Sequence, residues 1–455
     1  YIQFEFTEAF APRTLSITPS TGHQAHSGAL QASDDGVVFR TIMPVNLPDT
    51  ETGRHAENFA VETAPARFFR LTFDKGDTRA TRLTLGEINL TPQVILKDWH
   101  EKAGVWRVEN PARDTRTSIP ASCAVTSDKV MDISAHMDAS GKLTWEAPAG
   151  KWTILRFGYT PTGKTNHPAA KSGLGLQCDQ MSAKAAAFHW EHAVQPILDD
   201  IGPLAGKSLK HILIDSYEVH CQNWTPAFRE EFTKRRGYDL LHYLPAMTGR
   251  FVDGVDTTER FLWDVRRTIA DLYADNYFGA FRTLCHDHGL ELAAEPYGDG
   301  NFDDLTAGAA ADLPMTEFWV GSGSDPTGGK LASSIAHTHG RPIVAAEAFT
   351  ADSGEAWKQY PASMKDQGDW ALATGINRFV FHRYAHQPWL DRKPGMTMGP
   401  YGVHWERTQT WWPLVSSYHQ YLARCQTLLR EGATVADLCY LIPEGAPHVF
   451  RPPSS

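Results

Sequence analysis

Apolar and polar residues alternate in short runs over the first 95 residues of the chain. Runs such as TLSIT, ARFFRLTF and TLGEINL place apolar residues at about every second position, and turn-forming residues separate the runs. This period is typical of half-buried β-strands, and several short strands at such spacing indicate a β-sandwich. We therefore predict a β-sandwich over residues 1–95, followed by a connecting segment with further strands over residues 96–150.

The pattern changes to alternating strands and helices from about residue 151. Short apolar runs such as WTILRFGY, HILI, ELAA and RFVF alternate with segments whose apolar residues have helical spacing. This alternation is typical of parallel βα units, which build either an open doubly wound sheet or a closed barrel. No GxGxxG or P-loop motif follows a strand, so the usual nucleotide-binding reason for an open sheet is missing. We predict an α/β fold, with a TIM-type (β/α)8 barrel over residues 151–435 and the start of an interrupted further domain over residues 436–455.

The composition narrows the classes of function. The chain has 455 residues, a formal net charge of -10, and 42% hydrophobic and 21% charged residues, which is ordinary for a soluble protein. The acidity argues against a nucleic-acid partner, because phosphate binding requires a basic face. No run of about 18 apolar residues is present, so we expect no membrane span.

The ends and the cysteines lead to further expectations. The N-terminus has neither the basic nor the apolar region of a signal peptide, and it lacks an initiator Met, so we expect a processed or cut piece of a longer protein. The six cysteines include no CxxC pair. A thiolate zinc site is therefore not expected, and buried free thiols are the simpler interpretation.

Titratable residues stand where the predicted strands end. In a barrel these strand ends meet at one face, so the side chains would converge there. A single Glu at a strand end is most simply explained by an ion pair with an Arg. Several carboxylates together carry a large electrostatic cost unless they are protonated, paired or metal-bound, so the set predicts an active site. Its members are Asp215, Glu218, Glu295, Glu317, Glu347 and His382.

Aromatic residues near these strand ends favour a carbohydrate ligand. A single Trp is more often part of a core, but rings beside carboxylates suit sugars, whose C–H faces stack on rings and whose hydroxyls need acceptors. Two carboxylates are the minimal requirement for glycoside hydrolysis, one as a protonated acid and one as a base or nucleophile. An apolar or negatively charged environment keeps such an acid protonated. No GxSxG or HExxH motif is present to support another hydrolytic chemistry.

Several motifs are spread over roughly residues 150–445, and they are DSYEVHCQNWTPAFREEFTKRRGYDLLHYLPAMTGR, AAEPYGDGNFDDLTAGAAADLPMTEFW, AEAFT and NRFVFHRYAHQPW. They resemble the motifs of glycoside hydrolase family 106, the α-L-rhamnosidases. The resemblance implies inversion of configuration, a (β/α)8 barrel, calcium dependence, accessory β-sandwich domains and a periplasmic or secreted location. The N-terminal segment around ARFFRLTF resembles discoidin-like, galactose-binding-type sandwiches, and we expect it to support the enzyme domain.

The resemblance assigns roles to individual residues. Glu218 in DSYE matches the family's proposed general acid, and Glu347 in AEAFT matches its proposed general base. Glu317 in TEFW matches a carboxylate associated with calcium and with the sugar hydroxyls. Two departures, Tyr217 for a frequent Trp and His220 for a small residue, would alter the fit of the leaving group. The expected substrate contacts are Asp215, Trp224, Glu295, Trp319 and His382, of which the two carboxylates could also contact the metal or tune the acid's pKa.

The predicted function is an inverting α-L-rhamnosidase that removes terminal rhamnose from plant or pectic glycans or from rhamnosides. Glu218 would protonate the glycosidic oxygen, and Glu347 would deprotonate water on the opposite face, at a carboxyl separation of about 6.5–9.5 Å. Two alternatives stay open, a different barrel glycosidase of the β-galactosidase-like kind and a non-catalytic carbohydrate-binding protein. The intact carboxylate pair argues against the second. The sequence defines neither the linkage nor the oligomeric state.

Overall fold

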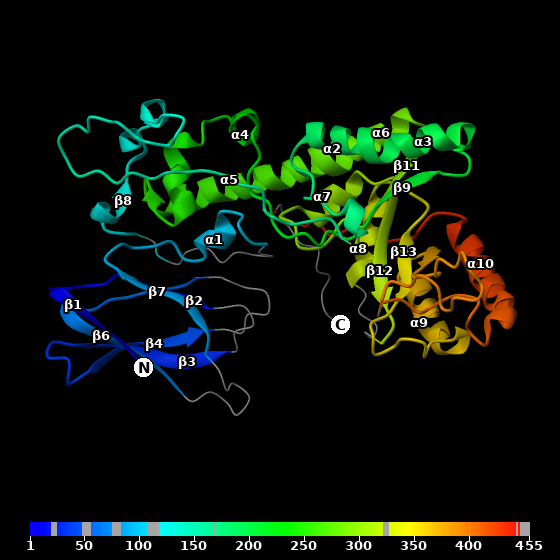
Figure 1. The fold of residues 1–455 in the computed structure, drawn as a ribbon, viewed down its shortest axis with the longest axis horizontal. Helices are drawn as coiled ribbons and strands as arrows, with labels where there is room; N and C mark the ends of the chain where they lie inside the picture. Colours follow the sequence, from blue (N-terminus) through cyan, green and yellow to red (C-terminus); the bar gives the residue numbers. More distant parts are fainter. Residues whose placement is uncertain are drawn as a thin grey trace. The chain divides into compact units, whose positions relative to one another are not determined.

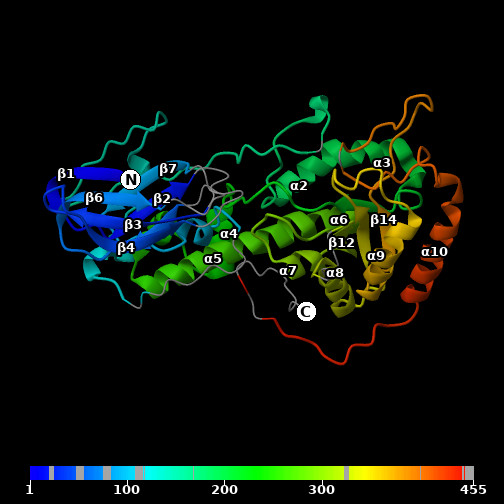
Figure 2. The same cartoon turned by 90° about the horizontal axis from the view of Figure 1, so that it is seen from below.

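The structure is a computed structural model, and it divides the chain into two compact units. One unit contains residues 1–160 and 226–268, and the other contains residues 161–225 and 269–455. Figures 1 and 2 show the elements of both units, which are described separately below. The described residues are 1–19, 25–47, 56–74, 83–107, 116, 118–167, 169–321, 327–399, 401–442 and 445.

Antiparallel strands form two sheets in the N-terminal part of the first unit. One sheet has the order β1-β6-β3-β4 and the other β5-β2-β7. Leu15 of one sheet and Leu30 and Phe69 of the other belong to one hydrophobic cluster and are fully buried. The runs TLSIT, ARFFRLTF and TLGEINL are strands as predicted, namely β2, β6 and β7, and the sandwich stays a prediction. The strands are β1 (Ile2–Phe10), β2 (Thr14–Pro19), β3 (His26–Ser33), β4 (Arg40–Leu47), β5 (Glu57–Ala60), β6 (Ala66–Phe73) and β7 (Leu85–Thr91).

The segment after the two sheets has fewer strands than the sequence suggests. Its described part contains one short strand, β8 (Ala124–Val125), which pairs in parallel with β10 (Phe251–Val252). The other elements are single turns of helix, namely α1 (Trp99–Lys102), η1 (Ala121–Cys123), η2 (Ser127–Lys129) and η3 (Ser134–His136).

The run WTILRFGY, which we predict as the first barrel strand, is not a strand in the structure. Ile154 and Tyr159 are 55% and 61% exposed, and no described segment pairs with the run. A strand requires a neighbour that satisfies its backbone N–H and C=O groups, and an apolar pattern does not reveal whether one is available. Of the predicted further domain, only residues 436–442 and 445 lie within the described part, and they form no strand.

Helices complete the first unit. α4 (Phe228–Arg236) ends at Gly237, whose φ of +82° is the left-handed conformation that favours glycine after a helix. η7 (Leu241–Thr248) follows, and α5 (Val255–Tyr273) contains the boundary between the units. The ammonium of Lys102, which is almost fully buried, lies 2.7 Å from the carboxylate of Glu259. This pairing is what a buried charge requires.

A half-barrel of parallel strands forms the centre of the second unit, in the order β14-β13-β12-β11-β9. Neighbours in this sheet follow one another along the chain, except that the short β10 of another sheet lies between β9 and β11. This confirms the predicted parallel α/β architecture. The closed barrel stays a prediction, because the described strands of this sheet supply five of its eight. They are β9 (His211–Ile214), β11 (Glu291–Ala294), β12 (Leu313–Trp319), β13 (Ala345–Thr350) and β14 (Arg378–Phe381).

Helices connect and cover the strands of the half-barrel. α6 packs against β11. α8 packs against β12, and α9 and α10 contact each other (Figure 2). The segments with helical spacing before β9 and β11 are helical as predicted. Among the described residues, no helix combines the length and apolarity needed to cross a bilayer. The helical elements are η4 (Lys171–Gly173), α2 (Ala183–His189), η5 (Trp190–Val194), α3 (Gln195–Ile201), η6 (Gly202–Leu204), η8 (Ala274–Gly279), α6 (Ala280–Asp287), α7 (Asp304–Ala309), α8 (Thr327–Thr338), α9 (Pro361–Ala373), η9 (Trp412–Leu414) and α10 (Ser416–Arg430).

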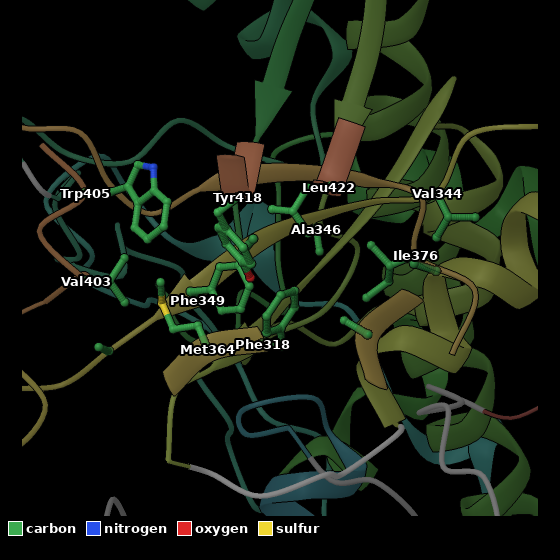
Figure 3. Packing of buried hydrophobic residues seen from close by; sticks show 14 of the residues in the cluster. Phe318, Val344, Ala346, Phe349, Met364, Ile376, Val403, Trp405, Tyr418 and Leu422 are labelled. Atoms are coloured by element: carbon green, nitrogen blue, oxygen red, sulfur yellow. The ribbon is translucent and has the colours of Figure 1, made fainter. Parts of the chain in front are cut away.

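A hydrophobic cluster that includes several aromatic rings contains residues near the C-terminal ends of β12 and β13 (Figure 3). The rings of Phe318 and Phe349 lie edge to face with centroids 4.9 Å apart. Phe349 has a φ of +62°, in the left-handed region, and the pairing of β12 with β13 shifts register at this point. Such a backbone costs roughly 1–2 kcal/mol for a residue with a side chain. Burial of the Phe349 ring offsets this cost. It also holds the end of β13 in place, and Phe349 lies only two residues after Glu347.

Candidate active site

The strand ends bring the predicted carboxylates to one edge of the half-barrel. Asp215 follows β9 and Glu295 follows β11, and these two strands end in register. Glu317 and Glu347 are register partners on β12 and β13. Side chains at paired positions of neighbouring strands point to the same face of the sheet. The structure therefore gathers the four carboxylates from four separate strands, as the sequence predicts.

Three of these carboxylates lie close enough to bind one cation. Asp215, Glu295 and Glu347 each offer an oxygen, and the three oxygens lie within 4.8 Å of one another. Oxygens bound to one Ca²⁺ at about 2.3–2.6 Å lie within about 5 Å of each other, so the spacing fits this ion. Glu317, to which the family resemblance assigns the metal, is not one of the three.

Glu295 has an unusual environment for a carboxylate. Its side chain is 0% exposed. The Tyr297 hydroxyl donates a hydrogen bond of 2.7 Å to Oε2, while Oε1 has no hydrogen-bond partner among the described residues. Burial, and then the nearby Asp215, raise the pKa of Glu295 well above its ordinary value. A buried carboxylate with an unsatisfied oxygen is costly, so this group requires a proton or a cation.

Glu317 and Glu347 also have raised pKa values, with burial as the main cause for each. The pKa of Glu317 is raised to about 7, and Glu347, Glu218 and Asp215 contribute to this shift. Trp319 Nε1 donates a hydrogen bond of 2.9 Å to Glu317. The pKa of Glu347 is raised although its carboxylate accepts a hydrogen bond from the hydroxyl of Thr350. Burial and the neighbouring charges therefore favour the protonated forms of Glu317 and Glu347 more than those of an ordinary exposed Glu.

His382 follows β14 and lies beside Glu347. Its Nδ1 is 3.8 Å from Glu347 Oε1, which is too far for a hydrogen bond, and its Nε2 is 3.4 Å from the sulfur of Met398. Burial is the main cause that lowers the pKa of His382. A neutral imidazole does not form an ion pair with a carboxylate. We therefore interpret His382 as an uncharged polar side chain next to Glu347.

The loop after β9 carries Glu218, and it is anchored through Tyr217. The Tyr217 side chain is buried, and its hydroxyl lies 2.9 Å from the hydroxyl of Tyr273. Its backbone N–H donates a hydrogen bond of 2.9 Å to the carbonyl of Tyr297. Glu218 is exposed and accepts a hydrogen bond of 3.0 Å from the Ser216 hydroxyl. The proposed acid thus lies on a fixed backbone at the same edge as the carboxylate cluster.

Gly298 allows the loop after β11 to approach the loop that carries Glu218. Its φ is +129°, and a Cβ at this position would lie 1.9 Å from the carbonyl oxygen of Tyr217. Only glycine fits such a contact. His220 Nδ1 lies 3.0 Å from the Asp299 carboxylate and links the same two loops. The sequence analysis missed this approach, for which the turn-forming EPYGDG is the available signal.

The two tryptophans predicted as substrate contacts differ in their relation to the carboxylates. Trp319 is half-buried, and its indole N–H is bound by Glu317, so it belongs to the cluster. Trp224 lies in the loop of Glu218, where its carbonyl accepts a hydrogen bond of 3.1 Å from Gln222. Its contact with substrate stays a prediction. Sequence reasoning missed the supporting hydroxyl of Thr350, three residues after Glu347 in AEAFT.

The raised pKa of Glu317 predicts a stability that depends on pH when a chelator is present. An unfolded Glu loses its proton near pH 4.3, whereas folded Glu317 keeps its proton to about pH 7. The folded state therefore binds more protons between these values. The free energy of unfolding should fall as pH rises through this window, by at most about 1.4 kcal/mol per pH unit for this group. Urea unfolding at several pH values measures the slope.

Two variants separate Glu317 from other carboxyls in this experiment. Glu317→Gln should flatten the slope, because the amide does not titrate. Glu230→Gln, on the exposed face of α4, removes a carboxyl outside the cluster and should leave the slope unchanged. A slope that is the same in both variants would contradict the raised pKa of Glu317.

The chain matches a protein-family model over most of its length. The family model described as alpha-L-rhamnosidase, glycoside hydrolase family 106, matches residues 16–451. The chain belongs to glycoside hydrolase family 106. The motifs around Glu218, Glu317 and Glu347 all lie within the matched part.

Two known proteins similar to this family 106 chain are longer than it is. The putative beta-glucuronidase of Formosa agariphila is 45% identical over 342 residues, which are 75% of this chain and 29% of the relative. The structure of the rhamnosidase from Novosphingobium sp. PP1Y is 28% identical, with a TM-score of 0.80, and the match covers 98% of this chain and 42% of that one. The chain therefore spans less than half the length of either protein.

Proposed function

We propose that this family 106 chain carries the catalytic carboxylates of an inverting α-L-rhamnosidase. The observation that supports this best is the set of strand-end carboxylates at one edge of the half-barrel, with Glu218 on an anchored loop beside it. Glu218 contributes to the raised pKa of Glu347, so the two groups interact electrostatically. Family membership and the similarity to a rhamnosidase structure support rhamnosides as the substrate class.

Glu218 and Glu347 have complementary roles in the proposed mechanism. Glu218 donates its proton to the glycosidic oxygen while the bond between this oxygen and the anomeric carbon breaks. Glu347 accepts a proton from a water molecule, whose oxygen forms the new bond to the anomeric carbon on the opposite face. This leaves the sugar with inverted configuration, and a separation of about 6.5–9.5 Å between the two carboxyls leaves room for the water.

Calcium is the proposed cofactor. Asp215, Glu295 and Glu347 would hold it, since their oxygens have suitable spacing and one oxygen of the buried Glu295 has no other partner. When bound, the ion would neutralise the clustered charges and offer coordination to sugar hydroxyls. Glu347 has two carboxylate oxygens, so it could contact the ion with one and the water with the other.

The release of nitrophenol from 4-nitrophenyl α-L-rhamnoside tests this function. We expect release in the presence of calcium, and a rate at least about tenfold lower after chelation, because a bound metal contributes several kcal/mol to a site of this kind. Restoring calcium should restore the rate. No release with calcium present would contradict the proposed activity, and release that is insensitive to chelation would contradict the cofactor alone.

Two further substrates distinguish the alternatives. One relative is named a putative beta-glucuronidase, so 4-nitrophenyl β-glucuronide belongs in the same assay, together with the β-galactoside. Hydrolysis of either of these in preference to the rhamnoside would assign a different glycosidase activity. Binding of rhamnose by titration without hydrolysis of any of the three would favour the carbohydrate-binding alternative.

A further inference from the structure

The segment that follows β14 folds into a structure with its own cavity. This segment leaves the half-barrel at His382. It folds back on itself where the Met396 N–H donates a hydrogen bond of 2.8 Å to the His386 carbonyl and the Arg383 guanidinium donates one of 2.6 Å to the Met396 carbonyl. The cavity has a volume of about 260 Å³. Its lining includes Gln387, Trp389, Arg392, Lys393, Arg407 and Thr408.

The charged side chains among the described lining residues are all positive. They are Arg392, Lys393 and Arg407, and none of the described lining residues is a carboxylate; Asp391 is their neighbour in sequence but is not part of this lining. Within the described part of the chain, none of the three cations forms an ion pair. Arg407 donates one hydrogen bond, of 3.2 Å, to the Tyr384 hydroxyl, which leaves other guanidinium donors for a ligand. In a chain of net charge -10, three unpaired cations around one cavity favour an anionic ligand.

The two sides of the cavity are joined by a buried carboxylate that is not part of the lining. Glu406 is 0% exposed. It accepts hydrogen bonds of 2.6 Å from the Gln387 side chain and 2.7 Å from the Thr408 N–H, and another from the Thr408 hydroxyl. These bonds satisfy the charge of Glu406 internally and hold the segment of Trp389 against the segment of Arg407. The cavity is therefore a built feature of the fold.

An exposed tryptophan provides the second property of the cavity. Trp389 is 62% exposed, and the guanidinium of Arg392 lies 5.6 Å from the centroid of its ring. An indole face can stack on the C–H face of a sugar, while an arginine and a lysine bind an anionic group through charge-assisted hydrogen bonds. The volume is below the about 300–1,000 Å³ of pockets that enclose a drug-sized ligand, and it suits a single sugar unit.

We propose that this cavity is a subsite for an anionic sugar residue, one that carries a carboxylate or a sulfate group, in the same substrate as the rhamnose. The proposal rests on the proposed function. The cavity belongs to the same substrate site in this proposal because the segment that forms it begins at His382, beside Glu347. It names the substrate class more narrowly, as a rhamnosylated acidic glycan. The neutral leaving group of an artificial rhamnoside would not use this subsite.

Direct titration tests the subsite without requiring catalysis. The probes are digalacturonic acid, its methyl ester and a sulfated galactose disaccharide, each added to the wild type, to Arg392→Gln/Lys393→Gln and to Lys184→Gln/Arg424→Gln. The last variant is matched in charge, and its two residues are exposed on α2 and α10. We expect the cavity variant to bind the anionic probes at least about tenfold more weakly, since hydrogen bonds to charged groups are lost, while the matched variant binds as the wild type does.

The outcomes of the titration show whether the anionic group is a uronate or a sulfate ester. They also show which results overturn the subsite. Preference for digalacturonic acid assigns a uronate, and preference for the sulfated disaccharide assigns a sulfate ester. Equal binding of the acid and its methyl ester, without binding of the sulfated disaccharide, would overturn the subsite. The subsite would also be overturned if the cavity variant bound the anionic probes as tightly as the wild type does. Arg407→Gln provides a second variant of the lining, and circular dichroism verifies that all variants are folded.

Kinetics then connect the subsite to hydrolysis. The cavity variant should hydrolyse a rhamnosyl-galacturonate with a KM at least about tenfold higher than the wild type, and 4-nitrophenyl α-L-rhamnoside at an unchanged rate. Unchanged KM for the acidic substrate would overturn the subsite while the rhamnosidase function stands. Lack of hydrolysis of both substrates by the wild type would overturn the proposed function, and the titration would still decide whether the cavity binds anionic sugars.

Discussion

Glu218→Gln should lower kcat/KM by about 10²–10⁴-fold for rhamnosides whose leaving group is a sugar alcohol, the range that general acid catalysis contributes. The amide has no acidic proton to give to the departing oxygen, which would then have to leave as an alkoxide. The 4-nitrophenyl rhamnoside should lose much less, because nitrophenolate is a stable anion that leaves without protonation. Steady-state kinetics on a rhamnosyl disaccharide and on the nitrophenyl substrate measure this difference.

Glu317→Gln is the informative control for this prediction. Glu317 has a pKa raised to about 7 and lies at the same edge of the half-barrel, so it is a second carboxyl that holds a proton near neutral pH. It should not show a loss that depends on the leaving group if Glu218 is the acid. A leaving-group-dependent loss in Glu317→Gln, with full activity in Glu218→Gln, would move the role of the acid to Glu317.

Glu347→Gln should reduce the hydrolysis of both substrates to a similar degree, by about 10²–10⁴-fold. The base acts on the attacking water and not on the leaving group, so the quality of the leaving group should not matter. In the wild type, proton NMR early in the reaction should show β-L-rhamnose as the first product from an α-linked substrate. Inversion of this kind follows from attack by water on the face opposite to the departing oxygen.

The position of Glu347 in the cation cluster requires a second variant. Asp215→Asn changes the same cluster without removing the proposed base, so added calcium should recover its activity to a large extent. Glu347→Gln should not recover at any calcium concentration. If calcium rescues Glu347→Gln equally well, the residue serves the ion and not the water. If α-L-rhamnose forms first, the reaction retains configuration and Glu347 is not acting as the base of an inverting mechanism.

Local patterns in the sequence were sufficient to locate several strands and the candidate carboxylates. The alternation in ARFFRLTF located β6. The carboxylates lie at one edge because parallel strands end on the same side of their sheet. Asp215 and Glu295 directly follow their strands, whereas Glu317 and Glu347 lie within β12 and β13, two to three residues before these strands end. The same reasoning was wrong for WTILRFGY. Its apolar residues satisfy the pattern of a strand, but no described segment forms hydrogen bonds with its backbone.

The sequence by itself determined the residue types of the site, their places at strand ends and the family to which the chain belongs. Tertiary structure decided which of them act together. The metal assignment illustrates the difference, because proximity of Asp215, Glu295 and Glu347 depends on strand register and on the burial of Glu295. The basic cavity likewise exists only because Glu406 joins segments that are separate in sequence. Distances and solvent exposure depend on contacts between distant residues, and no local pattern encodes those contacts.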